Sequence, residues 1–409
     1  MSRSLLALWF ASALVFLGAW AQIHHGAYER SQIIDTPVYQ SYGDLIVQGK
    51  LPYRDFGVEY PPGALPIFAL PSLGHSGPAE DGVREDYRTR FELLMVFCGL
   101  LVLAATAFTL RAVGASFLRS ALALGAIALA PLLLGSMVYS RFDYWPAAVT
   151  AVALALAASG RRRWAAVALG VAVAIKVYPA ALVPLLLVEA WKRRGRGEAL
   201  RCLALMAGAA LLLYVPFLVA SPSGVWESIH KQTGRPLQIE TLGAALLIAG
   251  HHLFGLGVSV SNGFGSQNLA SRFSGIAATL TTIAELAALL LVWVRYARSK
   301  DESADELLRY AAAAVVAFVA FGKVLSPQFM IWLVPLVALV AGRRGVLAGA
   351  LLAFALWLTL YWFPGRYWAF VNELKPGLTT VVLLRDLLLV AVCAVLVWPT
   401  PRRAATRSG

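Results

Sequence analysis

Acidic residues and tyrosines gather in one short stretch of an otherwise apolar chain. The stretch IIDTPVYQSYGDLIVQGKLPYRDFGVEYPPG (residues 33–63) follows closely on an apolar segment and carries the acids Asp35, Asp44, Asp55 and Glu59. A carboxylate held beside a hydroxyl can take its proton as a general base. We therefore expect the carboxylate that accepts the proton to lie in this stretch.

Basic residues in four later stretches supply the opposite charge. Arg141 lies in YSRFDYW, Lys176 in IKVYP, Arg235 in GRPLQIE and Lys323 in FGKVLSPQ. Ionisable side chains at membrane depth are costly, so they usually pair or serve a function. Lysine binds phosphate as a compact charge. We predict that these four residues bind a lipid phosphate; the alternative is that they form structural ion pairs.

The composition is that of a polytopic membrane protein. Of the 409 residues, 59% are hydrophobic and 14% are charged, whereas soluble domains carry about 25% charged residues. Mean hydropathy is +0.70. The net charge of +13 could suggest nucleic-acid binding, but the basic residues cluster at the ends of apolar stretches, where they are topology signals. We predict one α-helical membrane domain over residues 1–409 that contacts membrane lipids and no nucleic acid.

The basic clusters orient the chain, because cytoplasmic loops are enriched in lysine and arginine. Placing the clusters inside predicts about twelve spans of about 20 residues, an external first loop at 23–90 and a cytoplasmic tail at 399–409. Residues 164–191 separate two basic clusters and are too short for two full crossings, so we expect a broken helix pair that turns at 175–179. The other predicted helices are 4–22, 91–112, 119–138, 144–160, 202–220, 241–255, 273–294, 306–322, 328–342, 345–363 and 378–398.

The N-terminal helix has a second interpretation. Arg3, the apolar run after it and the small residues Ala19 and Ala21 would also suit a cleavable signal peptide. We favour a retained first span, because a multi-span protein needs such a start.

This topology places the unusual polar residues on the outer side of the membrane. A base, a phosphate clamp and a lipid groove on one face suit sugar transfer from a polyprenyl-phosphate donor to a lipid or glycan acceptor. No P-loop or strand-linked glycine fingerprint is present, so no nucleotide site is expected. The candidate substrate-binding residues are Tyr39, Tyr53, Tyr60, Asp143, Tyr178, Glu240 and Gln328.

Other reactive residue types give weaker signals. Cys98, Cys202 and Cys393 lie in apolar stretches without a disulfide or zinc spacing, and His251 and His252 lack a third ligand. We expect no organic cofactor, while the acidic loop leaves a divalent metal possible.

Arg385 and Asp386 are neighbours within a predicted span, where adjacent residues do not face each other. Each is therefore expected to find another partner.

Four regions of the chain resemble glycosyltransferase family 87. RFDYWPA followed by IKVYP resembles its central R-x-D-x-x-P-A and K-x-Y-P signature, and RPLQIETL and KVLSPQFMIWLVPL resemble two later stretches. DTPVY, GKLPYRDF and EYPP resemble its first external loop. The resemblance implies a GT-C type, inverting transferase that uses a polyprenyl-phosphate sugar, most familiarly mannose. The composition, rich in Ala, Arg and Gly, suggests a bacterium, so we expect the reaction on the outer face of the cytoplasmic membrane.

The resemblance also implies roles for individual residues. Asp35 occupies the position of the catalytic base, with Asp44, Asp55 and Glu59 as reserves. Gln328 stands where one mannosyltransferase branch carries histidine, so donor sugar and acceptor do not transfer from that branch. Two other functions stay open: a lipid-linked sugar transporter or flippase, and a ligase that moves a whole glycan from a polyprenyl diphosphate.

Overall fold

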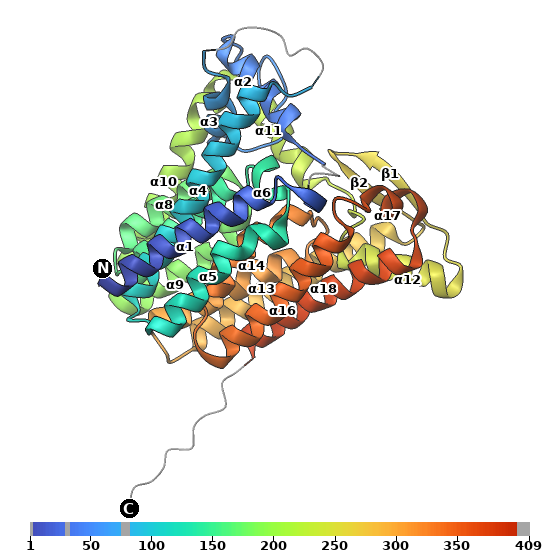
Figure 1. Cartoon of the computed structure of the whole chain (residues 1–409). Helices are drawn as coiled ribbons and strands as arrows, with labels where there is room; N and C mark the ends of the chain where they lie inside the picture. Colours follow the sequence, from blue (N-terminus) through green and yellow to red (C-terminus); the bar gives the residue numbers. More distant parts are fainter. Residues whose placement is uncertain (1–2, 29–32, 75–81, 399–409) are drawn as a thin grey trace, which may run out of the picture.

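A bundle of long apolar helices forms the body of the protein (Figure 1). The computed structural model describes residues 3–28, 33–74 and 82–398; the predicted tail at 399–409 lies outside them. Within these residues, seven helices are long and apolar enough to cross a membrane. They are α1 (Arg3–Gln22), α4 (Glu85–Ala112), α5 (Phe117–Leu134), α10 (Arg196–Ala220), α13 (Ser274–Arg298), α16 (Gly342–Trp362) and α18 (Pro376–Val397). The polytopic helical fold is confirmed, but the count of twelve spans is not.

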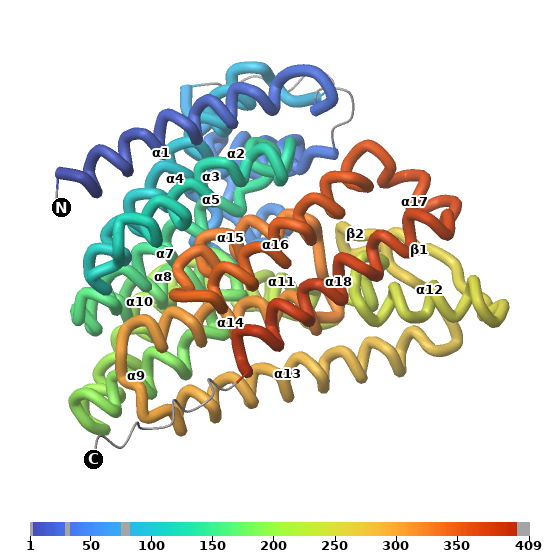
Figure 2. The backbone as a smooth tube through the Cα atoms, turned by 60° about the horizontal axis from the view of Figure 1, so that its bottom comes forward, coloured from blue at the N-terminus to red at the C-terminus, as the bar shows by residue number. Residues whose placement is uncertain are grey.

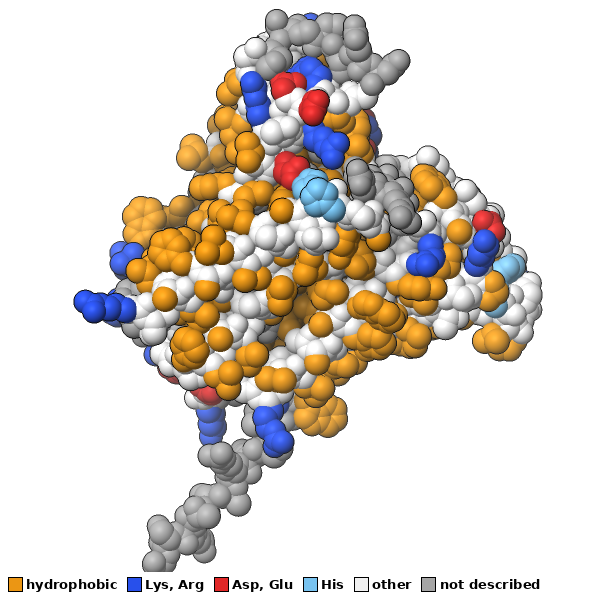
Figure 3. Space-filling model, viewed as in Figure 1, with side chains coloured by type: hydrophobic (Ala, Val, Ile, Leu, Met, Phe, Trp, Pro, Cys, Tyr) orange, Lys and Arg blue, Asp and Glu red, His pale blue; other side chains and the backbone are white. Residues whose placement is uncertain are grey.

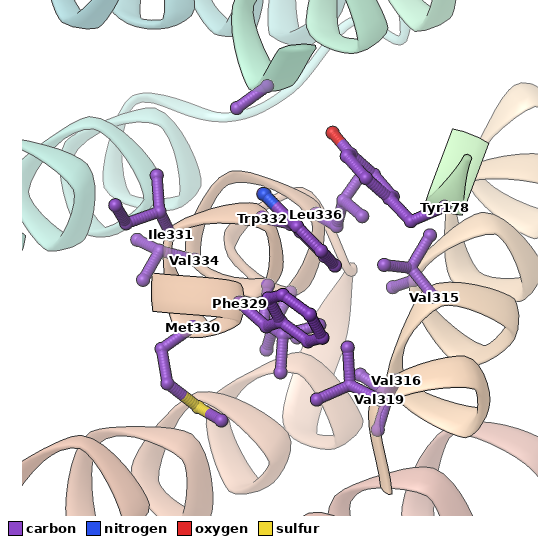
Figure 4. Packing of buried hydrophobic residues seen from close by; sticks show 14 of the residues in the cluster. Tyr178, Val315, Val316, Val319, Phe329, Met330, Ile331, Trp332, Val334 and Leu336 are labelled. Atoms are coloured by element: carbon purple, nitrogen blue, oxygen red, sulfur yellow. The ribbon is translucent and has the colours of Figure 1, made fainter. Parts of the chain in front are cut away.

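Shorter helices pack between and beside these long ones. Of these, α14 is buried along almost its whole length, and α15 packs beside it in the core that Figure 4 shows. Helices of this kind bury apolar side chains on every face, because other helices surround them. The shorter helices are α6 (Met137–Ser140), α7 (Tyr144–Ala158), α8 (Arg162–Ile175), α9 (Val183–Arg194), α12 (Leu242–Phe254), α14 (Ala304–Phe321) and α15 (Met330–Ala338), with the turn η5 (Pro327–Phe329) before α15.

The predicted broken pair is present as α8 and α9. Lys176 ends α8 in an extended conformation, and the 3₁₀ turn η4 (Tyr178–Leu182), which contains Pro179, leads into α9. The chain folds back on itself here, because Arg162 at the start of α8 donates to a carboxylate oxygen of Glu189 near the end of α9 at 2.7 Å. With 14 and 12 residues, each helix is shorter than the roughly 20 residues of a full span.

Residues 23–90 fold into more structure than the predicted loop. They contain η1 (Gly26–Tyr28), α2 (Thr36–Val47), η2 (Pro62–Ala64), α3 (Leu65–Ala69) and η3 (Leu70–Ser72), and α4 already begins at Glu85 instead of residue 91. Figure 1 shows α2, α3 and α11 (Pro222–Thr233) together in a lobe above the bundle. No helices were predicted within this loop from the sequence; its prolines and glycines separate short helices instead of preventing them.

One small hairpin departs from the all-α expectation. The strands β1 (Ser259–Gly263) and β2 (Ser266–Ala270) pair antiparallel. The backbone N–H of Ile239 donates to Gln267 O at 3.0 Å, and that of Leu269 donates to Leu237 O at 2.9 Å. The hairpin therefore holds the segment between α11 and α12 in place. Close to it lies α17 (Tyr367–Glu373), as Figure 2 shows.

Polar and apolar side chains separate on the surface. Figure 3 shows hydrophobic side chains over the broad middle of the visible face, whereas charged side chains lie on the upper lobe, at the opposite lower edge and on the projection at the right. A membrane imposes this distribution, because charges are expensive in its hydrocarbon core. The polar lobe and the arginine-rich edge thus lie at opposite ends of the bundle.

Gly170 tests the packing that holds α8 in place. A Cβ atom at Gly170 would lie 2.2 Å from Met206 O of α10, whereas one at Gly208 on α10 would meet nothing within 4 Å. We expect Gly170→Ala to destabilise the protein by about 1–3 kcal/mol and Gly208→Ala to be neutral or slightly stabilising. Thermal unfolding in one detergent measures both. Equal melting temperatures for the two variants would contradict this close contact.

Candidate functional site

Four segments that are distant in sequence meet between the bundle and the lobe. They are the start of α2, the turn between α6 and α7 (residues 141–143), the break between α8 and η4 (residues 176–178), and the start of α15. Each is an element end, where the chain leaves regular structure and can aim polar side chains inward. Asp35 is the N-cap residue of α2, but its side chain makes no capping hydrogen bond.

The Asp35 carboxylate is instead paired with Arg141. Arg141 Nη1 forms a salt bridge with Asp35 Oδ2; the arginine side chain is 6% exposed and that of the aspartate is 31% exposed. A second guanidinium nitrogen, Nη2, donates to Ile33 O at 3.1 Å, and the Tyr39 hydroxyl donates to Asp35 Oδ2 at 3.4 Å. Burial lowers the pKa of Arg141 to about 10, while the negative charge of Asp143 opposes this. Arg141 thus stays charged at neutral pH and holds a half-exposed carboxylate.

A second ion pair lies deeper. Lys176 Nζ donates to Asp143 Oδ1 at 2.6 Å, and Trp332 Nε1 donates to the same oxygen at 2.8 Å. The ammonium group also lies 4.5 Å from the ring centre of Phe142 and 4.9 Å from that of Trp332. The other Asp143 oxygen, Oδ2, is buried and has no hydrogen-bond partner. The aspartate and the aromatic faces therefore share the task of replacing the water that Lys176 loses.

Trp332 was missed by the sequence analysis. It is buried in α15, and Figure 4 shows its indole between the rings of Phe329 and Tyr178. Tyr178 stacks on it at 4.1 Å and donates its hydroxyl hydrogen to Thr150 Oγ1 at 3.0 Å. Tyr178, predicted to bind substrate, thus supports the ion pair from behind. The tryptophan in KVLSPQFMIWLVPL was a visible signal, but an apolar stretch alone does not show which aromatic residue has a polar partner.

Tyrosines of the lobe connect the two ion pairs. Tyr39 and Tyr60 pack edge to face at 5.8 Å, and both contact the ring of Phe142, at 5.6 and 5.0 Å. Burial raises the pKa of Tyr39 well above its ordinary value, so its hydroxyl remains a hydrogen-bond donor. Tyr53 lies one layer further out and donates to Tyr60 O at 2.6 Å. Tyr39 and Tyr60 therefore form an aromatic wall beside Asp35 and Lys176.

Glu240 and Arg235 add two more charges near the site, and each influences the other. Glu240 is buried, and its Oε2 atom has no hydrogen-bond partner. Burial raises the pKa of Glu240 from 4.5 to about 7, although the charges of Arg385 and Arg235 lower it. Arg141 is also close enough to be influenced by Glu240. This acid can consequently exchange a proton near neutral pH.

Arg385 and Asp386 form an ion pair with each other, contrary to the prediction that each would find another partner. Arg385 Nε lies 2.8 Å from Asp386 Oδ1, and both side chains are fully buried. The two neighbours do pair, because the long arginine side chain can reach the adjacent carboxylate, although these two atoms do not meet with hydrogen-bond geometry. Arg385 Nη2 also donates to the backbone O of Glu240 at 2.9 Å. Helix α18 therefore supports the Glu240 segment.

Two of the reserve acids, Asp44 and Asp55, have partners outside the group formed by Asp35, Arg141, Asp143 and Lys176. Asp44 accepts hydrogen bonds from Arg84 and Ser72, and Asp55 is exposed, with its pKa lowered to about 2 mainly by a hydrogen bond from Arg54.

The remaining three residues lie around the segment between α11 and α12 or before α15. Lys323 donates to Thr233 O at 2.9 Å, and Glu59 lies under the hairpin turn at Gly265. Gln328 is half-buried in η5. Among the described residues, no three His, Cys, Asp or Glu side chains gather at a metal-binding distance, and the three cysteines are free and buried.

The chain matches glycosyltransferase family 87 over residues 59–327, more than half of its length. It belongs to this family. The matched range of this family 87 glycosyltransferase contains Arg141, Asp143, Lys176 and Glu240, whereas Asp35 lies before it.

One solved structure similar to the family 87 chain is ArnT from Cupriavidus metallidurans bound to undecaprenyl phosphate. The TM-score is 0.48 and the sequence identity 14%, over 97% of this chain and 77% of that chain. A comparison with curated proteins finds no match.

The buried pair of this glycosyltransferase should carry stability. Removing one partner of a buried ion pair leaves an uncompensated charge, which costs about 3–5 kcal/mol. We therefore expect Asp143→Ala to lower the melting temperature strongly, whereas Asp55→Ala, at an exposed ion pair, should change it little. Thermal unfolding of both variants checks this. A melting temperature of Asp143→Ala equal to that of Asp55→Ala would exclude a stabilising role for the pair.

Glu240 predicts a pH dependence of stability. Its pKa is higher in the folded protein, about 7, than the ordinary 4.5, so the folded state binds one more proton between these values. Stability should then fall as pH rises from about 4.5 to 7, by up to about 3 kcal/mol.

Glu240→Gln removes this titration. It should raise the melting temperature at pH 8 relative to the unmodified protein and have little effect at pH 4.5. Glu227→Gln, at an exposed acid, is the control. A pH profile of Glu240→Gln that stays parallel to that of the unmodified protein would rule out this titration.

Proposed function

We propose that the protein transfers a sugar, mannose as the first candidate, from a polyprenyl-phosphate donor to a lipid or glycan acceptor. The reaction would take place at the outer face of a bacterial cytoplasmic membrane, with inversion at the anomeric carbon. The observation that carries the proposal is the half-exposed Asp35 carboxylate, held by buried Arg141 beside the Lys176–Asp143 pair. This arrangement combines a proton acceptor with cations in one place.

The distribution of arginines supports the outer location. Arg161, Arg162 and Arg163 follow the far end of α7 from Asp143, and arginine clusters favour the cytoplasmic side. A lipid-linked donor has its phosphate at the membrane surface, which is the depth expected for residues at the outer ends of α7 and α8.

The basic residues near Asp35 could bind a phosphate. Arg141 and Arg235 both lie near enough to Lys176 to disfavour its charge, while Asp143 favours it. Arg141 already neutralises Asp35 and Lys176 already neutralises Asp143. An incoming phosphate can bind Arg141 and Arg235, and its arrival would release Asp35 from Arg141. Lys323 is a further candidate for binding the donor phosphate. It donates to the backbone oxygen of Thr233, which lies two residues before Arg235.

The chemical step needs one base. The acceptor hydroxyl oxygen would attack the anomeric carbon while its proton passes to Asp35 Oδ2, and the bond to the donor phosphate would break with its electron pair on the phosphate oxygen. Arg141, Lys176 and Arg235 would stabilise the charge that develops on this leaving group. A single displacement inverts the anomeric centre. Tyr39 and Tyr60 would offer ring faces and a hydroxyl to the sugars.

Asp35→Asn tests the base. The variant keeps the size of the side chain but cannot accept the proton, so turnover should fall by at least about a hundredfold while binding of the donor changes little. The assay combines purified protein in lipid, radiolabelled polyprenyl-phosphate mannose and a mixed bacterial lipid extract, with chromatography of the products. Asp55→Asn, at an exposed acid outside the site, should keep full turnover.

The other outcomes are equally informative. Unchanged turnover in Asp35→Asn would reject Asp35 as the base and direct attention to Glu59 or Glu240. Movement of the labelled lipid across a sealed vesicle without cleavage of the sugar bond would instead support a transporter.

Lys176→Ala and Lys323→Ala should raise the donor concentration needed for half-maximal rate.

A further inference from the structure

A groove opens between α4 and α7 at the end of the bundle remote from Asp35. These two helices lie side by side (Figure 2). The cavity between them has a volume of about 720 Å³. Its walls come from one face of each helix, with spacings of three and four residues that bring the lining side chains into one row. From α4 these include Leu101, Ala104 and Phe108, and from α7 they include Val152 and Ala155.

Alanine is the reason that the groove exists. The helices pack tightly where Ala105 meets Ala151 and Ala155. Further along, Ala104, Ala112 and Ala158 line the cavity with methyl groups that are too small to fill it. From Leu101 to Ala112 the groove follows α4 for about 16 Å at 1.5 Å per residue. This is about half of a hydrocarbon core of about 30 Å, the depth of one leaflet.

Two arginines stand at the open end of the groove. Arg111 and Arg161 both line it and are both exposed. In the part of the chain that the structure describes, neither has a carboxylate within salt-bridge distance, so both guanidinium groups are open to a ligand. Two unpaired guanidinium groups at the mouth of an apolar groove attract an anion that carries an apolar tail.

The backbone holds both arginines in place. Helix α4 ends at Ala112 and α7 at Ala158, and a glycine with positive φ follows two residues later in each case, Gly114 at +63° and Gly160 at +75°. The N–H of Gly114 donates to Arg111 O at 3.1 Å, and that of Arg161 donates to Leu156 O at 2.9 Å. These are glycine-terminated helix ends, so the two arginines project from ordered turns. Trp164, 67% exposed, follows at the level where tryptophan anchors a helix to the membrane surface.

We infer that this groove binds an anionic phospholipid of the inner leaflet, with an acyl chain along the alanines and the phosphate between Arg111 and Arg161. The charge of the mouth favours an anionic headgroup over a zwitterionic one. The depth of the groove fits one leaflet and excludes a molecule that spans the bilayer. The site is independent of the proposed donor site, which lies at the other end of α7.

Native mass spectrometry of the full chain tests the inference. The delipidated protein is titrated with phosphatidylglycerol or with phosphatidylcholine of the same chain length, and the melting temperature is followed in parallel. We expect tighter retention of phosphatidylglycerol and a rise in melting temperature with this lipid alone. The double variant Arg111→Gln/Arg161→Gln should bind it about thirtyfold more weakly, since each basic group at an anionic surface contributes about fivefold.

Two further variants test separately whether the position of the arginines and the space in the groove are needed for lipid binding. Arg194→Gln/Arg343→Gln removes two exposed arginines outside the groove and should retain the lipid like the unmodified protein. Ala104→Phe keeps both arginines but fills the groove, and it should also lose the lipid. Equal retention of the two lipids by the unmodified protein, undiminished retention in the first double variant, or normal retention in Ala104→Phe would each overturn the proposal.

Discussion

The ion pair between Lys176 and Asp143 is the interaction on which the site depends. A charge inside a membrane bundle is tolerated only with a partner and with polar or aromatic contacts. To provide them, the break after α8, the start of α7 and Trp332 of α15 must meet at one point. The same meeting places Arg141, two residues before Asp143, against Asp35 of α2. An ion pair therefore helps to position the lobe on the bundle.

A second layer of buried charge supports the first. Arg385 reaches from α18 to the backbone of Glu240, and the hairpin holds the residues on either side of Gln238. Buried charged groups of this kind contribute little net stability but penalise any arrangement that leaves them unpaired. In this protein they connect the C-terminal helices to the segment that carries Arg235 and Glu240. The two halves of the chain thus define one polar interior.

The sequence was sufficient to predict the elements that depend on local chemistry. The break near Lys176 followed from the short distance between two arginine clusters and from Pro179, and the ends of α7 and α18 followed from the limits of apolar runs. The helices α2 and α3 and the hairpin were not predicted, because each is short and stabilised by contacts that are distant in sequence. The partner of Asp35 was not predictable for the same reason: Arg141 is 106 positions away, as their residue numbers give. The Trp332 hydrogen bond and the Arg385–Asp386 pair depend on side-chain directions that spacing does not specify.

The fold-back of α8 and α9 sets the orientation of everything that follows it. Arg162 and Glu189 meet at 2.7 Å, so the chain leaves this pair on the side where it entered. If residues 162–194 instead formed one uninterrupted helix, about 33 residues at 1.5 Å each would extend about 50 Å and could cross the bilayer. Every later span would then be inserted with its ends exchanged. The extended backbone at Lys176 would thus decide on which side of the membrane the later helices begin.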